Sequence, residues 1–431
     1  MNLWERNTSH SDIKTMKMLS YKEAKKIETE YGSPFYILDE AAFLKNYADI
    51  AKAFGGRYEK FILAYSYKTN YIPYLCRIIK SKGGFAEVVS RLEYDLALKV
   101  GQKPEKIVFN GPVKYYEDIE LALSGRSIVN LDSFSEIDHV AKYAAKHPKE
   151  EIKVGLRINI GLSDKKGRSH IQGHLQAGRF GFDPSDENIK KVISRLKSIG
   201  NVMVNGLHGH TSTTDRSVWC YKVITDTLCK IAERFFPETV EYINIGGGIF
   251  GYIPPKMRWA KTPSFDDYAK AVCKVLKNNK WVQKQKTFLM LEPGIAMAAN
   301  ALSFITKVIS IKEIRGRMFV TVDGSAYNIK PTFHKINQPY QIIGKIDNKK
   351  RCTFSVVGST CMEKDYLLTG ITDALPNTGD FIKIDNVGAY TVVLTPPFIN
   401  PAPAIICKKG NKLKCVRSRQ TLNDMFKNYA L

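Results

Sequence analysis

The sequence predicts an α/β protein in which a (β/α)8 TIM barrel is followed by a C-terminal all-β domain. Three observations predict this fold. Between about residue 36 and residue 295, short apolar runs alternate with polar stretches that carry a helical pattern. There are eight such runs, and eight parallel strands joined by crossover helices close naturally into a barrel. After Asn300 the pattern changes to strand-like segments broken by Gly, Pro and Asn turns.

Each barrel strand is predicted from a short apolar run, and each helix from a periodic polar stretch beside it. The predicted strands are 61–68, 85–90, 107–110, 127–132, 153–159, 204–210, 240–245 and 288–292. The predicted helices are 39–54, 72–81, 92–101, 116–124, 136–147, 187–199, 218–236 and 265–276. Because the active sites of such barrels lie at the C-terminal ends of the strands, the residues that end these runs are the first candidates for chemistry.

The β domain is predicted from shorter segments, which include 303–311, 318–322, 352–357 and 380–384. The apolar segment 35–38 precedes the first barrel helix and is expected to add a strand to this domain. We therefore predict an N-terminal segment (1–39) that contributes to the β domain, a barrel (40–295) and a C-terminal β domain (296–431).

The composition excludes several classes of protein. With 431 residues, 44% of them hydrophobic and 25% charged, the chain has the proportions of a soluble globular protein. It shows no signal peptide and no apolar run of membrane-spanning length, so we expect a cytoplasmic protein. Its eight cysteines lack CxxC pairs or zinc-like spacing, so neither a disulfide framework nor a structural zinc site is predicted.

The net charge of +23 would attract an acidic substrate, an acidic protein partner or nucleic acid. The excess is spread thinly along the chain, which favours a solvated basic surface. We therefore predict no nucleic-acid partner and no membrane contact.

The first candidate for chemistry is Lys68. Alternation in the run that it ends places Ile62, Ala64, Ser66 and Lys68 on one face. Small residues below a terminal lysine leave space in a barrel interior, and desolvation would lower the pKa of its amine toward a nucleophile that can form a Schiff base. Taken alone, a lysine that reaches solvent at the end of its strand explains the position equally well.

A second candidate is the glycine run Gly246, Gly247 and Gly248, which follows another barrel strand. Backbone N–H groups without a Cβ can surround a phosphate. The alternative is that these glycines serve only a turn.

Glu292 ends the eighth strand, where its carboxylate can hydrogen-bond a protonated ring nitrogen and make a pyridinium into a strong electron sink. The alternative is a salt bridge inside the barrel to Arg157, which also ends a strand.

His208 and His210 share one face if their strand stays regular, which suggests either a ring that stacks on a flat cofactor or a pair of metal ligands. His170 and His174, in a nearby loop, give the metal alternative weak support.

Together a lysine, a glycine loop, a stacking histidine and a carboxylate are what pyridoxal phosphate requires. The chain resembles the fold-type III pyridoxal-phosphate decarboxylases, which include the diaminopimelate, ornithine and arginine decarboxylases, from about residue 33 to residue 403. The resemblance implies an alanine-racemase-like barrel and pyridoxal 5'-phosphate as the cofactor. The barrel motifs that carry it, in family order, are Ala64-Tyr65-Ser66-Tyr67-Lys68-Thr69-Asn70, Gly206-Leu207-His208-Gly209-His210, the Gly246–Gly248 run and Glu292-Pro293-Gly294.

The resemblance assigns a role to most of these residues. It makes Lys68 the cofactor lysine and His210 the stacking histidine, and Arg157 joins them as a cofactor-binding residue. In the β domain, Gly358-Ser359-Thr360-Cys361 resembles the segment of the family's catalytic cysteine, and Gly388-Ala389-Tyr390 that of its cofactor-contacting tyrosine. In this family Cys361 would reach the partner subunit's barrel, which implies a homodimer with shared active sites.

The substrate end departs from the family. Ile295 follows Glu-Pro-Gly where relatives usually have Arg, and Lys330 replaces the Arg that clamps the distal carboxylate of diaminopimelate. Glu363 lies one position later than the family's glutamate. Lys330 and Glu363 are therefore candidate substrate-binding residues, for an amino acid or for a larger anionic or carrier-protein-bound conjugate.

These observations predict a cytoplasmic, pyridoxal-phosphate-dependent amino-acid decarboxylase without a metal. A racemase is the nearest alternative, but racemisation needs a second base and usually avoids a full electron sink. A non-catalytic regulatory homologue and a metal-dependent barrel hydrolase would each fit part of the pattern. Lys68 and Cys361 argue against the regulatory homologue.

Overall fold

The computed structural model describes residues 19–175, 177–254, 257, 262–344, 351–410 and 412–430. Contacts divide the chain into two compact units. The barrel unit contains Phe43–Ala301 and Asn386–Thr395, and the β unit contains the described parts of 1–42, 302–385 and 396–431. The predicted boundaries at residues 39 and 295 stay predictions.

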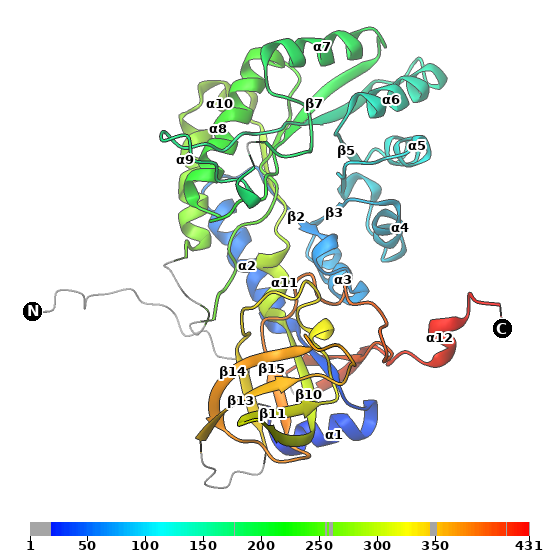
Figure 1. Ribbon diagram of the computed structural model, residues 1–431. Coiled ribbons are helices and arrows are strands. Elements are labelled where there is room, and N and C mark those ends of the chain that lie inside the picture. The colour runs from blue at the N-terminus through cyan, green and yellow to red at the C-terminus, as the bar shows by residue number, and fades with distance from the viewer. Residues whose placement is uncertain are drawn as a thin grey trace, which may run out of the picture. The chain divides into compact units, whose positions relative to one another are not determined.

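The barrel unit is a closed barrel of parallel strands, each paired with the next along the chain, and β9 pairs with β2 to close the ring (Figure 1). This confirms the predicted (β/α)8 barrel. Its strands are β2 (Phe61–Ser66), β3 (Phe85–Val88), β4 (Ile107–Phe109), β5 (Ile128–Leu131), β6 (Ile152–Arg157), β7 (Val202–His208), β8 (Tyr242–Asn244) and β9 (Phe288–Leu291).

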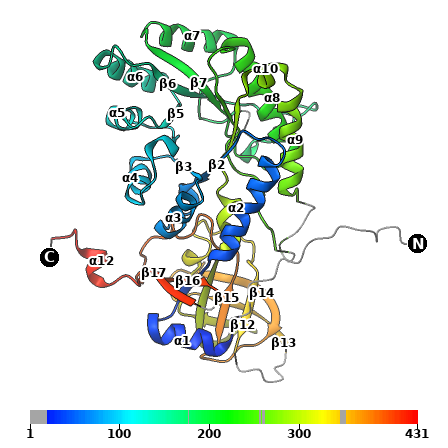
Figure 2. The ribbon, with the colours of Figure 1, turned by 180° about the vertical axis from the view of Figure 1, so that it is seen from behind.

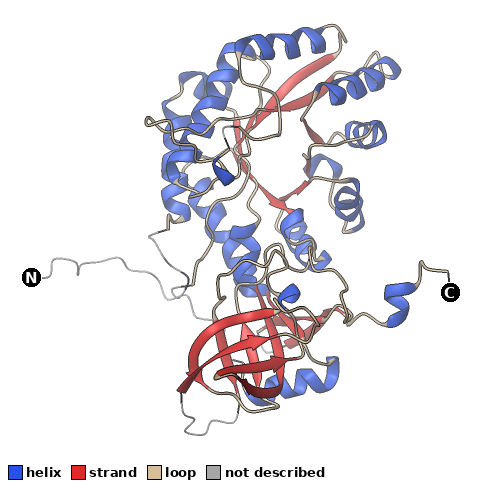
Figure 3. Cartoon of the chain, in the orientation of Figure 1, coloured by secondary structure: helices blue, strands red, loops and turns tan. Residues whose placement is uncertain are grey.

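Helices surround the barrel strands; the first of them precedes strand β2, and the others follow β2 or a later strand (Figure 3). They are α2 (Glu40–Gly55), α3 (Pro73–Ser81), α4 (Arg91–Lys99), α5 (Tyr116–Ser124), α6 (Phe134–Lys146), α7 (Asp186–Lys197), α8 (Val218–Phe235), α9 (Phe265–Asn278), α10 (Lys280–Gln285) and α11 (Ile295–Ala298).

Local sequence explains both kinds of element. In α9, Ser264 and Asp267 form a capping box at the N-terminus, and the buried residues recur with helical spacing, at Tyr268, Val272 and Leu276 among others. Inside the barrel, Ala64, Val108 and Met290 are buried together. The small Ala64 lies in the strand that precedes Lys68.

The β unit is built on a sheet with the strand order β14-β13-β11-β10-β1-β16-β17, and β15 pairs with both β10 and β12 (Figure 2). Strand β1 is antiparallel to β10 and parallel to β16. The elements are α1 (Tyr21–Tyr31), β1 (Phe35–Asp39), β10 (Leu302–Ile314), β11 (Arg317–Val322), β12 (Tyr340–Ile343), β13 (Arg351–Val357), β14 (Tyr366–Ala374), β15 (Phe381–Ile384), β16 (Ala404–Lys409), β17 (Lys412–Arg417) and α12 (Leu422–Phe426).

Residues Asn386–Thr395 belong to the barrel unit although the β unit contains the residues on both sides of them. They are held there by backbone hydrogen bonds, among them Gly388 N–H to the Ala299 carbonyl. No helix among the described residues is long and apolar enough to cross a membrane, and the cytoplasmic location stays a prediction.

Candidate active site

Lys68 lies just beyond the end of its strand. Strand β2 ends at Ser66, and Lys68 is the central residue of a 3₁₀ turn, Tyr67–Thr69. The predicted alternation therefore stops two residues before the lysine. Two hydrogen bonds hold the turn: Tyr390 N–H donates to the Thr69 carbonyl at 2.9 Å, and Tyr65 Oη donates to the Asn70 carbonyl at 2.7 Å.

The amine of Lys68 donates to Glu87 Oε2 at 2.6 Å. Burial lowers the pKa of Lys68, but the carboxylates of Glu87 and Glu292 outweigh burial, so its pKa is raised above the ordinary value. The lowered pKa predicted for Lys68 is wrong, because Glu87, a buried acid inside an apolar strand, lies beside its amine. In this structure the lysine is a charged group held toward the barrel interior.

Glu292 directly follows β9 and is fixed by three side chains. Asn110 Nδ2 and Asn244 Nδ2 donate to its Oε1 at 2.7 Å and 2.6 Å, and His208 Nε2 lies 3.3 Å from its Oε2. Burial raises the pKa of Glu292, but His208, Lys68 and Asn110 more than offset burial and lower its pKa below the ordinary value. The carboxylate is therefore ionised and oriented before any ligand binds.

The two histidines of the β7 region have different partners. Strand β7 ends at His208, which faces Glu292, and His210 lies beyond the strand. The regular strand assumed for a shared face therefore ends before His210. His210 Nδ1 accepts a hydrogen bond from Gly247 N–H at 3.2 Å. Burial, then Lys68 and Arg157, lower the pKa of His210 to about 3, so its ring is neutral.

The glycine run packs against both His210 and the backbone of Glu292. Gly246 and Gly248 have φ values of +67° and +91°, and a Cβ on Gly247 would lie 2.1 Å from the Glu292 carbonyl oxygen. Turn geometry and close packing thus require these glycines. Among the described residues, the N–H of Gly248 has no hydrogen-bond acceptor, and a free N–H at a half-exposed glycine fits a bound phosphate.

Arg157 does not form the alternative salt bridge with Glu292. Its Nη1 lies 3.3 Å from Asp132 Oδ2, and its Nη2 donates to the His210 carbonyl at 3.3 Å. Its buried Nε has no hydrogen-bond partner in the described structure. Arg157 therefore holds the backbone at the histidine and keeps one donor free.

The remaining predicted residues are divided between the two units. Tyr390 belongs to the barrel unit, and not to the β domain where the sequence analysis placed it. Lys330, Cys361 and Glu363 belong to the β unit. Cys361 and Glu363 are exposed, whereas Lys330 is buried, and burial lowers its pKa against the opposing effect of Asp365.

Sequence reasoning missed a network of polar side chains at the barrel centre. Asn110 joins Glu87 to Glu292, Asn130 Nδ2 donates to Asn110 Oδ1 at 2.8 Å, and Tyr242 Oη donates to Asn130 Oδ1 at 2.8 Å. The available signal was a polar residue at the end of an apolar run, repeated in neighbouring strands. These residues fix the two carboxylates on which the charge of Lys68 depends.

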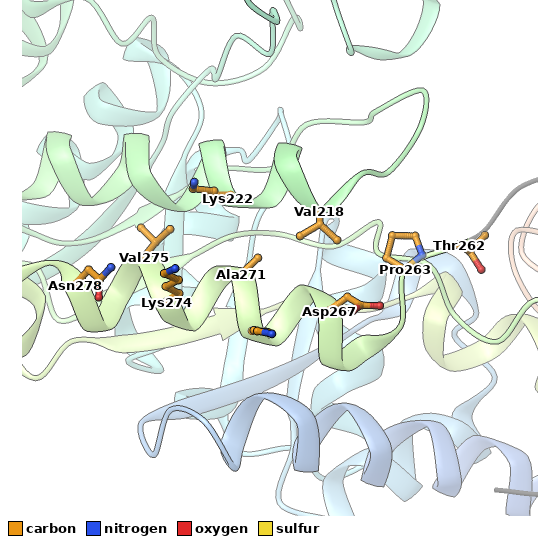
Figure 4. Close-up of a pocket in the computed structure, with 10 residues that line it drawn as sticks. Val218, Lys222, Thr262, Pro263, Asp267, Ala271, Lys274, Val275 and Asn278 are labelled. Carbon is orange, nitrogen blue, oxygen red and sulfur yellow. The ribbon is translucent and has the colours of Figure 1, made fainter. Parts of the chain in front are cut away.

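A pocket of about 590 Å³ lies between α8 and α9, and none of the predicted site residues lines it (Figure 4). Val218, Pro263, Ala271 and Val275 give it apolar walls, and three lysines border it. Its position does not connect it to the chemistry of the barrel end, so it is not the candidate active site.

The barrel end fits pyridoxal phosphate. An ionised Glu292 suits a protonated ring nitrogen, a neutral His210 suits a ring face, and the Gly248 N–H suits a phosphate oxygen. Lys68 supplies the amine to which such a cofactor attaches.

Comparison with known proteins gives the same class. Residues 40–299 match the pyridoxal binding domain of the pyridoxal-dependent decarboxylases. The diaminopimelate decarboxylase of Methanothermobacter thermautotrophicus is 25% identical over 414 residues, covering 94% of this chain and 93% of that protein. The one from Methanocaldococcus jannaschii is 28% identical over 418 residues, covering 94% and 92%. A crystal structure of the M. jannaschii enzyme superposes with a TM-score of 0.85 at 26% identity, covering 95% of this chain and 94% of that one.

The chain belongs to the pyridoxal-dependent decarboxylase family. It is a carboxy-lyase that uses pyridoxal 5'-phosphate to decarboxylate an amino acid. Nothing in these comparisons favours the racemase, the regulatory homologue or the metal-dependent hydrolase.

Proposed function

We propose that this enzyme decarboxylates an amino acid whose far end differs from that of diaminopimelate, and that Lys68 holds the cofactor. The observation that carries the assignment is the placement of Lys68 in one hydrogen-bonded network with Glu87, Asn110 and Glu292. When bound, pyridoxal phosphate supplies an electron sink for the electron pair left by the loss of CO₂.

The residues of the barrel would divide the work as follows. Glu292, held ionised, keeps a proton on the ring nitrogen. His210 offers a neutral ring face. In the loop formed by Gly246, Gly247 and Gly248, the free backbone N–H of Gly248 would bind phosphate, because the N–H groups of Gly246 and Gly247 already donate to Asn244 and His210. Arg157 is a positioning residue, because its guanidinium holds the carbonyl of His210. Tyr390 supports the turn that bears Lys68 through its backbone N–H.

The residues of the β unit would serve the substrate. The exposed thiol of Cys361 can hold the proton that the product carbon needs, and in a homodimer it would act in the partner's active site. Lys330 and Glu363 would contact the far end of the substrate. A lysine offers one point charge where an arginine grips a carboxylate with two donors, which argues against diaminopimelate as the best substrate.

The relatives point to one competing substrate. The proteins named above are diaminopimelate decarboxylases, and one M. jannaschii structure, with a TM-score of 0.83 at 25% identity and coverage of 95% of this chain and 94% of that one, contains L-lysine. Diaminopimelate is therefore the first compound to test, followed by other amino acids and their larger anionic or carrier-bound conjugates.

Two measurements test the proposal. Borohydride reduction of the holoenzyme should fix the cofactor mass on the peptide that contains Lys68, and the Lys68→Ala variant should release no CO₂ from any substrate. The matched control is Lys60→Ala, which changes a lysine just before the same strand. Attachment of the cofactor to another lysine would refute the assignment.

A further inference from the structure

Three potential metal ligands meet in the barrel unit, away from the residues assigned to the cofactor. His170 lies in the segment between β6 and α7, Asp215 lies between β7 and α8, and Cys220 lies in the first turn of α8. One nitrogen, one carboxylate oxygen and one sulfur atom from these residues all lie within 4.8 Å of one another. Of the histidines considered above as metal ligands, only His170 belongs to this cluster, and its partners there are Asp215 and Cys220.

His170 lies between two carboxylates. Its Nδ1 is 2.9 Å from Asp215 Oδ2, and its Nε2 is 3.6 Å from Asp164 Oδ2. The Nε2 atom is buried and has no hydrogen-bond partner among the described residues. A neutral imidazole has one N–H and can serve only one carboxylate. If the proton is on Nε2, Nδ1 and Asp215 Oδ2 are two acceptors that face each other at 2.9 Å, an arrangement that a bound cation would stabilise.

Cys220 adds a soft third donor to this pair. Its side chain is buried, its Sγ lies 3.7 Å from Asp215 Oδ1, and Ser217 Oγ donates to Sγ at 3.3 Å. Zinc favours mixed nitrogen, oxygen and sulfur ligands in a tetrahedron, in which bonds of about 2.0–2.3 Å separate neighbouring ligand atoms by about 3.3–3.8 Å. The 3.7 Å between Cys220 Sγ and Asp215 Oδ1 lies within this range. The 2.9 Å between His170 Nδ1 and Asp215 Oδ2 is shorter, so a bound ion would push these two atoms apart.

We propose that His170 Nδ1, Asp215 and Cys220 bind one zinc ion, with water as the fourth ligand. Cys220 loses its thiol proton to solvent when the metal binds. Asp164 accepts the Nε2 proton of His170, as carboxylates next to metal-bound histidines do. Asp164 is itself fixed, because its Oδ1 accepts the N–H groups of Lys166 and Arg168.

The ion has a structural role in this arrangement. It links the segments that follow β6 and β7, which also share backbone hydrogen bonds from Gln172 N–H to the Ser212 carbonyl and from Thr214 N–H to the His170 carbonyl. These two segments begin beside Arg157 and His210. Zinc binding should therefore stabilise this part of the barrel without taking part in the chemistry.

The test uses the purified full-length holoenzyme, stripped of metal with a chelator and titrated with Zn²⁺ and Co²⁺. We expect one zinc per chain by elemental analysis, a higher melting temperature with zinc, and cobalt d–d bands in the red, where a pyridoxal chromophore does not absorb. Cys220→Ser should abolish the cobalt bands. Cys229→Ser, a buried cysteine on the same helix, is the matched control and should keep them.

A second variant keeps the test decisive if Cys220→Ser does not fold. Asp164→Asn changes a half-buried loop residue and should weaken zinc binding by about 10–100-fold without abolishing it. Absence of bound zinc in the wild type, or equal affinity in wild type and Cys220→Ser, would overturn the proposal.

Discussion

The barrel end and the residues of the β unit that we propose to bind substrate differ in how many hydrogen-bond and ion-pair partners they have within their own chain. In the barrel unit, Lys68 and Glu292 are held by partners a few ångströms away. In the β unit, Cys361 and Glu363 are exposed, and buried Lys330 forms no ion pair with any residue that the structure describes. Cofactor chemistry needs charges that are fixed in advance, whereas residues for the substrate or a second subunit stay free to bind it.

The largest expected effect is at Glu292. Glu292→Gln keeps the shape of the side chain but removes the charge that would hold a proton on the cofactor ring, so kcat should fall by at least about 100-fold. The cofactor should stay bound, because Lys68 and the glycine loop are unchanged. Steady-state kinetics and the visible spectrum measure the two effects. Glu241→Gln, an exposed acid before β8, is the control, and an unchanged kcat in Glu292→Gln would remove Glu292 from the chemistry.

The second prediction concerns Cys361 and the homodimer. Lys68→Ala and Cys361→Ala should each be inactive or nearly so. If each active site takes Lys68 from one chain and Cys361 from the other, subunit exchange between the two variants should restore roughly a quarter of wild-type activity. Mixing Lys68→Ala with Cys352→Ala, a half-buried cysteine of β13, gives the reference level for a thiol outside the site. No recovery after verified exchange would contradict a shared site.

The third prediction concerns substrate choice. Diaminopimelate should be a poor substrate, with kcat/KM below about 10⁴ M⁻¹s⁻¹. Lys330→Arg should raise this value by tenfold or more, because a bidentate contact to a charged group is worth about 1.5–3 kcal/mol. Lys364→Arg, on the same unit but exposed, is the control. A wild-type kcat/KM above the stated level would show that Lys330 suffices for a lysine-pathway decarboxylase.

With the net charge of +23, turnover of the preferred anionic substrate should fall as salt increases.

The smallest effect is on stability and involves Glu93, a buried acid in α4. Burial raises its pKa to about 7, from an ordinary value of 4.5. The folded state therefore keeps a proton that the unfolded state has lost, and the stability that this gives declines as pH rises from 4.5 to about 7. Glu93→Gln should remove this decline. As pH rises from below 4.5 to above 7, the free energy of unfolding of Glu93→Gln should therefore increase relative to that of wild type, by at most about 3 kcal/mol. Urea unfolding across this pH range measures the gain, and equal pH profiles for the two proteins would contradict it.

Most of the barrel could be predicted because its strands are short and apolar. Each of the eight predicted runs overlaps one strand, and their ends differ from those of the strands by at most two residues. The largest consequence of such a difference is at Lys68, where a tyrosine hydroxyl and a distant backbone N–H fold the strand end into a turn. Tyr65 lies within the run, but Tyr390 lies more than 300 residues later, so no pattern within the run reveals that contact.

The site could be predicted only in part. Lys68, His210 and Glu292 stand out because each is a polar residue at the end of an apolar run in a recognisable motif. Glu87 and Asn110 do not stand out, because the contacts that they make in the site depend on which strands are neighbours around the barrel. The pKa of Lys68 therefore could not be obtained from its own strand. In the β unit, the segments named from the sequence include neither β16, whose partner β1 is more than 360 residues earlier in the chain, nor β17, which pairs with β16.

The return of residues 386–395 to the barrel unit limits how this protein can be divided. The chain passes between the two units at residues 42/43, 301/302, 385/386 and 395/396. A fragment that ends at residue 301 would keep every barrel strand but lose Tyr390 and Gly388, whose backbone groups bond to Thr69 and Asn70 beside the lysine. No single proteolytic cut or gene fusion point yields an intact barrel unit. Any chimera with a relative must therefore transfer residues 43–301 and 386–395 of the barrel unit together. The barrel unit cannot be exchanged as one continuous segment without part of the β unit.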